Sequence, residues 1–150
     1  VYYNGNWKTF YLDMIHDFNK KLLHKHELAI GLFYFYKNHI ISEVKEGVTL
    51  TFENCSELFE IIHSYYGIST PFVYISNRKN SYSFVPTGHF KSSKLFPNFI
   101  GYGVVTYDAI NTKVATLEQS FLENETKIFD DLNEALLWAQ ELIKPLSDLD

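Results

Sequence analysis

The polar stretch Ser76–Tyr82 holds the residues best suited to bind a ligand, because it joins cations, amides and hydroxyls at the end of an apolar segment. If that segment is a central parallel strand, its carboxyl end lies at the edge where open α/β sheets bind ligands. Such groups could hold an anion or a polar head group. The candidate ligand-binding residues are Ser76, Asn77, Arg78, Asn80, Ser81 and Tyr82, with an apolar wall from Tyr82, Phe84, Phe90 and Phe96. The alternative is that Asn and Ser form turns and that Arg78 and Lys79 are solvated.

The remaining reactive side chains do not gather into a catalytic or metal-binding set. His24 and His26 would share one face of a strand, but no third ligand stands at metal-binding spacing. Cys55 falls in the first turn of a predicted helix, where the helix dipole would favour a thiolate. It also shares an apolar face with Leu58 and Ile62, so we interpret it as a small hydrophobic residue. With no nucleophile elbow and no phosphate-binding glycine loop, we expect no catalytic residue, no metal, no cofactor and no enzymatic activity.

Composition limits the classes of partner and compartment. A chain of 150 residues with a net charge of -5 fits one domain and argues against binding to nucleic acid. The one cysteine cannot form an intramolecular disulfide, and no apolar run is long enough to span a membrane, so we expect a cytoplasmic protein. The 11 tyrosines and 13 phenylalanines could fill a core, line an apolar pocket or form a partner surface.

The last third of the chain predicts strands that alternate with helices. Phe99–Thr106 is an apolar run of strand length, and Lys127–Phe129 is a second extended segment. In the segment between them, apolar residues recur at helical spacing, namely Ile110, Val114, Leu117 and Phe121. Asp131 and Glu134 then form a capping box for a helix that Pro145 should end. Parallel strands joined by helices are typical of α/β proteins, so we predict an α/β fold.

The preceding segments add a hairpin, three helices and a strand. Leu28–Tyr36 is predicted to be one strand, joined by a turn at Lys37 and Asn38 to its partner His39–Val44. Thr51 or Asn54 could cap the next helix, which Gly67 should end. The further predicted elements are a strand at Pro71–Ser76, a short helix at Gly88–Phe96 and an amphipathic N-terminal helix at Trp7–Leu23.

Three stretches carry a family resemblance: Glu46–Thr51, Val73–Arg78 with Asn80–Ser83, and Lys127–Leu132 with Glu134, Ala135 and Trp138. They resemble a branch of small, largely uncharacterised bacterial proteins with the STAS-like fold of the anti-sigma-factor antagonists (SpoIIAA-like proteins). Over about residues 28–143, the resemblance implies an N-terminal β-hairpin and then alternating helices and strands. The helices would pack on a mixed, mainly parallel sheet of about five strands. We therefore expect a single STAS-like domain over residues 1–150, with residues 1–27 as an N-terminal extension.

Members of this fold serve as regulatory interaction modules, and some relatives suggest binding of nucleotides or lipids. The resemblance thus implies a noncatalytic regulatory module that binds a protein partner or a second copy of itself, and we expect the aromatic segment Tyr2–Tyr36 to form the contact. The alternative is a domain that binds a nucleotide, an anion or a lipid at Ser76–Tyr82. Signalling members carry a phosphorylatable Ser, typically after an Asp, where the helix after the central strand begins. Because no acidic residue occurs from Ser64 to Tyr107, we do not expect that phosphosite here.

Overall fold

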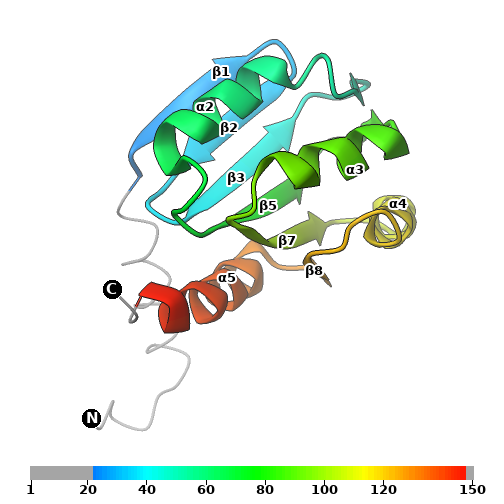
Figure 1. The fold of residues 1–150 in the computed structure, drawn as a ribbon. Coiled ribbons are helices and arrows are strands. Elements are labelled where there is room, and N and C mark those ends of the chain that lie inside the picture. Colours follow the sequence, from blue (N-terminus) through cyan, green and yellow to red (C-terminus); the bar gives the residue numbers. More distant parts are fainter. Residues whose placement is uncertain (1–21, 148–150) are drawn as a thin grey trace, which may run out of the picture.

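The structure is a computed structural model that describes residues 22–147, apart from the side chains of His89, Phe90 and Ser93. Its main element is a six-stranded sheet with the order β1-β2-β3-β5-β7-β8 (Figure 1). These strands are β1 (His24–Leu28), β2 (Gly31–Phe35), β3 (His39–Val44), β5 (Phe72–Arg78), β7 (Phe99–Thr106) and β8 (Glu125–Phe129). Two short strands, β4 (Thr49–Leu50) and β6 (Ser83–Phe84), form a separate parallel pair. The helices are α2 (Ser56–Tyr66), α3 (Pro86–Leu95), α4 (Ala109–Gln119) and α5 (Leu132–Ser147).

The predicted α/β fold class is confirmed. β1, β2 and β3 pair in antiparallel fashion, whereas β3, β5, β7 and β8 run parallel to one another. The hairpin is therefore followed by alternating helices and strands, as expected. The sheet has six strands rather than about five, because β1 adds an edge strand. The predicted helix Trp7–Leu23 lies, except for its last two residues, outside the described part of the chain.

The prediction that Leu28–Tyr36 is one strand is wrong. The chain turns at Ala29 and Ile30, so that Leu28 pairs with Gly31. Gly31 has a φ of 156°, and a Cβ at this position would lie 2.5 Å from the carbonyl oxygen of Glu43. Only glycine fits there, which makes the tight turn possible. Ile30 is buried, so the turn contains an apolar residue and cannot be distinguished from the neighbouring strands in the apolar sequence Leu28–Tyr36.

Three predicted boundaries also move. β5 extends to Arg78 instead of ending at Ser76, and α5 continues through Pro145 to Ser147. Thr51 and Asn54 accept hydrogen bonds from each other's backbone N–H, at 3.0 and 2.8 Å, and so form a turn of their own before α2 begins at Ser56. Gly67 ends α2 as predicted.

Three helices cover one face of the sheet and one covers the other (Figure 1). The crossovers from β3 to β5, from β5 to β7 and from β7 to β8 all move in the same direction across the sheet. Because such crossovers are almost always right-handed, they place α2, α3 and α4 on the same face. α5 follows the last strand and packs on the opposite face, against Val73, Ile75 and Val105.

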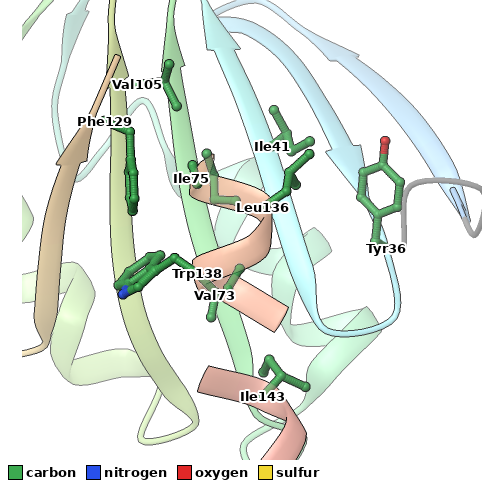
Figure 2. Packing of buried hydrophobic residues seen from close by; sticks show 11 residues of the cluster. Tyr36, Ile41, Val73, Ile75, Val105, Phe129, Leu136, Trp138 and Ile143 are labelled. Atoms are coloured by element: carbon green, nitrogen blue, oxygen red, sulfur yellow. The ribbon is translucent and has the colours of Figure 1, made fainter. Parts of the chain in front are cut away.

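α5 lies close to the sheet because β7 presents two glycines to it. A Cβ at Gly101 would lie 2.8 Å from Cδ1 of Leu142, and a Cβ at Gly103 would lie 3.0 Å from the indole of Trp138. Trp138 fills the space above these glycines and packs beside Phe129 of β8 (Figure 2). The α5 face is therefore tightly filled, in contrast to the opposite face.

α4 is rotated by one residue, about 100°, from the orientation that its apolar spacing predicts. Ile110 and Leu117 are 74% and 56% exposed. The buried residues of the helix are Asn111, Ala115 and Glu118. The predicted helix is confirmed, but the prediction of its buried face is wrong, because polar contacts described below hold Glu118 inside.

The turn between β2 and β3 is held by a residue of α2. The Tyr66 hydroxyl donates to the carbonyl oxygens of Tyr36 and His39, at 2.6 and 2.9 Å. The ring of Tyr36 stacks on that of His39, with centroids 4.2 Å apart. His39 is buried, and burial lowers the pKa of its imidazole from 6.5 to about 3.

The pKa of His39 predicts a loss of stability in mild acid. In the unfolded chain, His39 takes up a proton below pH 6.5, whereas in the folded chain it does so only when the pH nears about 3. The folded state is therefore most stable above pH 6.5 and loses stability as the pH falls from 6.5 towards 3. We expect a loss of about 1.4 kcal/mol per pH unit in this window from His39 alone. Urea unfolding of the wild type and of His39→Phe, which keeps a ring over Tyr36, measures it. Equal pH slopes for the two proteins would contradict the prediction.

Candidate functional site

A cavity of about 100 Å³ lies between the sheet and the helices α2 and α3. Its floor is formed by β5 and β7, with Phe72 and Phe99 among the lining residues. α2 supplies a wall that includes Cys55 and Leu58, and β4, β6 and α3 supply the remaining sides. Most of the lining side chains are apolar, as is typical of sites for small molecules.

Two of the three tyrosines that line the cavity, Tyr82 and Tyr102, belong to a buried polar network. Tyr74, Tyr82 and Tyr102 all line the cavity. The Tyr82 hydroxyl lies 2.5 Å from the hydroxyl of Ser76 and also interacts with that of Tyr102. The Tyr102 hydroxyl donates to Oε2 of Glu118 at 2.8 Å. Buried polar groups are costly unless they are hydrogen-bonded, and here they satisfy one another.

A buried ion pair completes the network. Arg78 donates from Nη1 to Oε1 of Glu118, and both side chains are fully excluded from solvent. Nη2 of Arg78 donates to the carbonyl oxygen of Tyr82 at 2.8 Å, and the guanidinium lies 3.8 Å from the centroid of the Tyr82 ring. The ring thus covers the cation by a cation–π contact. Because Arg78 belongs to β5 and Glu118 to α4, the pair fixes the rotation of α4 against the sheet.

The titratable groups that line the cavity are uncharged at neutral pH. Burial raises the pKa of Tyr82 to about 12 and raises the pKa values of Tyr74 and Tyr102 well above 10.0. Burial also raises the pKa of the Cys55 thiol to about 11. The interpretation of Cys55 as a small buried hydrophobic residue is therefore confirmed, and the thiolate favoured by the helix dipole is wrong.

The predicted site residues fall into two groups, of which the first lies beside the cavity. Ser76 and Arg78 belong to strand β5 rather than to a loop, and both take part in the buried network with Tyr82. Arg78 is therefore not a loop cation that faces solvent. Of the predicted apolar wall, Tyr82, Phe84 and Phe96 line the cavity, and the side chain of Phe90 is outside the described residues.

The second group ties the ends of the strands together. Asn77 donates from Nδ2 to Oε2 of Glu43 at 3.1 Å and accepts from the Tyr107 hydroxyl at 2.6 Å. Asn80 donates to the carbonyl oxygen of Val44 at 3.1 Å. The backbone N–H of Ser81 donates to Glu46 at 2.7 Å, and its hydroxyl accepts from Nδ2 of Asn111 at 3.3 Å. These contacts hold the loop after β5 against β3 and α4.

The two histidines of β1 make aromatic and hydrogen-bonding contacts. The rings of His24 and His26 have centroids 4.5 Å apart, and Nε2 of His26 lies 3.0 Å from the Tyr65 hydroxyl. Within residues 22–147, no three His, Cys, Asp or Glu side chains come close enough to hold a metal ion. No helix in that range has the length and apolar character needed to cross a membrane.

Sequence reasoning missed Glu118, Tyr74 and Tyr102. One signal for Glu118 was present, because Asn111, Ala115 and Glu118 share a helical face that competes with the apolar one. The excess of tyrosine was noticed, but composition does not say which rings meet.

The ion pair predicts a large cost for the loss of one partner. Arg78→Met leaves the Glu118 carboxylate buried without its cation, so we expect the free energy of unfolding to fall by about 3–5 kcal/mol. Urea denaturation measures this loss. The double variant Arg78→Met/Glu118→Leu removes both charges and should recover most of it. If the single variant is as stable as the double variant, the ion pair does not have this role.

No protein-family model matches the sequence, and the search of curated proteins also gives no match. Among solved structures, the chain is similar to an uncharacterised protein of the DUF3478 family from Shewanella loihica PV-4, described as having a SpoIIAA-like fold. The two chains are 16% identical, with 77% of this chain and 90% of that chain covered and a TM-score of 0.48.

Proposed function

We propose that this protein is a noncatalytic binding module that holds a small, largely apolar ligand in the cavity beneath α2 and α3. The observation that carries the proposal is a preformed space of about 100 Å³ whose lining is mainly aromatic and aliphatic. Such a space in an otherwise close-packed interior is typical of a binding site. The proposal takes up small-ligand binding, the alternative to partner binding in the sequence analysis, and moves it from the loop after β5 to the cavity beside it.

The state of the lining groups supports binding without catalysis. The thiol of Cys55 and the hydroxyl of Tyr82, with pKa values of about 11 and 12, are protonated at neutral pH. General bases and nucleophiles instead have pKa values close to the working pH. The groups that touch a bound molecule would therefore orient it rather than react with it.

A second candidate function, binding of a protein partner or a second copy, is favoured by the outer face of α4. Ile110 and Leu117 lie one and a half to two helical turns apart along this face, and Tyr107 near its start is 53% exposed. Exposed apolar groups that lie together are typical of contact surfaces. The aromatic rings of β2 are less suited to this role, because Phe33 and Phe35 are buried.

The ligand proposal predicts that toluene stabilises the protein. A ligand at ten times its Kd adds about 1.4 kcal/mol to the free energy of unfolding, which raises Tm by roughly 3–6 °C for a chain of this size. Differential scanning calorimetry with toluene and indole measures the shift. Cys55→Met fills part of the cavity and should abolish the shift, whereas the matched variant Cys55→Ala keeps the cavity open and should retain it.

If neither compound raises Tm, or if Cys55→Met responds as the wild type does, the cavity is not a binding site for such molecules.

The partner proposal predicts that charges on α4 reduce association without unfolding the protein. Ile110→Lys/Leu117→Lys changes only exposed positions, so we expect Tm to stay within a few degrees and self-association to be lost. Sedimentation velocity over a concentration series measures the oligomeric state. Ile68→Lys, at an exposed apolar position elsewhere, is the control and should leave association unchanged. A wild type that stays monomeric throughout would contradict self-association.

A further inference from the structure

We infer that the cavity selects uncharged, ring-sized molecules and rejects carboxylates and phosphates of the same size. This inference rests on the proposed ligand-binding function and adds the chemical class of the ligand. It differs from the expectation that cations near Ser76–Tyr82 would hold an anion or a polar head group.

The charges nearest to the cavity cancel each other. Arg78 and Glu118 form an ion pair, and neither side chain is exposed to solvent. The face of the Tyr82 ring, 3.8 Å from the guanidinium, covers Arg78. Lys91, on α3, lies 5.8 Å from the ring of Phe52 at the rim and is itself exposed. Among the described residues that line the cavity, none is Asp, Glu, Lys, Arg or His.

The hydroxyls of Tyr82 and Tyr102, which line the cavity, already have hydrogen-bond partners within the protein. The network runs from Ser76 through Tyr82 and Tyr102 to Glu118, and from there to Arg78. A ligand with a carboxylate would have to give up its hydration and would find no cation to replace it. Burial of an unpaired charge is strongly unfavourable, whereas an apolar molecule gains by leaving water.

The size and shape of the space point to a single ring. The rings of Phe72 and Phe96 meet edge to face with centroids 5.8 Å apart, and those of Phe72 and Phe99 stack at 5.6 Å. An aromatic ligand could extend these contacts, which favour stacked and edge-to-face geometry. An apolar cavity of about 150 Å³ holds benzene in another protein, and the space here is smaller, about 100 Å³, but has openings at its rim. It therefore has room for one ring, and the methyl group of toluene or the second ring of indole would extend to an opening, whereas a nucleotide is far too large.

The first test compares neutral aromatic ligands with aromatic analogues that carry a carboxylate. Isothermal titration calorimetry on the full chain at neutral pH would use toluene against benzoate, and indole against indole-2-carboxylate. We expect each neutral compound to bind at least about 100-fold more tightly than its anion, since an unpaired buried charge costs several kcal/mol. The variant Cys55→Met should lose the binding of the neutral compounds, which locates them in the cavity.

The second test uses Cys55, the one cysteine in the chain, as a reporter inside the cavity. The thiolate attacks the sulfenyl sulfur of a methanethiosulfonate, a mixed disulfide forms, and methanesulfinate leaves. We expect the neutral methyl reagent to label Cys55 at least about tenfold faster than the sulfonatoethyl reagent, relative to their rates on the urea-unfolded chain. Indole should slow the labelling by the methyl reagent.

The outcomes separate this inference from the function on which it rests. Binding of benzoate as tightly as toluene, together with equal relative labelling rates for the two reagents, would overturn the charge selectivity alone. A lack of binding by all four compounds would overturn the proposed function and the inference with it.

Discussion

The buried ion pair between Arg78 and Glu118 is the constraint on which the rest of this face of the molecule depends. It connects the end of β5 to the last turn of α4, two elements between which β6, α3 and β7 lie in the chain. Because two charges withdrawn from water must remain paired, α4 cannot rotate without a large loss of stability. The free energy that burial of Ile110 and Leu117 would add is smaller than this loss. Both residues are therefore exposed to solvent.

The same pair shapes the cavity. Tyr82 covers Arg78 with the face of its ring, and Tyr102 donates its hydroxyl to Glu118, so that both rings also line the cavity. The cavity itself exists because three crossovers in one direction place α2, α3 and α4 together on one face of the sheet. On the other face, α5 covers the strands alone and packs directly on Gly101 and Gly103. One face of the sheet is thus tightly closed, and the other has room for a ligand.

The sequence predicted the elements well wherever local patterns and tertiary packing agree. Phe99–Thr106 forms a strand with the predicted bounds, because it is a short apolar run in the middle of the sheet. Asp131 stands before α5 and accepts a hydrogen bond from the N–H of Asn133, as expected for a capping residue. The β1–β2 turn was missed because Ala29 and Ile30 carry no turn signal, and the geometry depends on contact with Glu43 of a third strand.

The site was harder to predict, since its chemistry comes from residues far apart in sequence. Arg78 was one of six candidate site residues, but its partner lies 40 residues away on a helix whose apolar spacing suggested a different orientation. The aromatic wall was partly predicted, because Phe84 comes soon after the loop and Phe96 stands at the end of the next helix. A cavity, however, is set by what side chains leave unfilled, and no single sequence pattern encodes it.

The contact of Tyr66 with the β2–β3 turn has a consequence for the order of folding. The Tyr66 hydroxyl donates to two carbonyl oxygens of the β2–β3 turn, which contains no glycine. The turn is therefore stabilised in part by a helix that is synthesised after the hairpin. Hairpin and helix should therefore form and open together as one cooperative unit. The antiparallel part of the sheet, from β1 to β3, can then be completed only after residues up to Tyr66 have emerged from the ribosome.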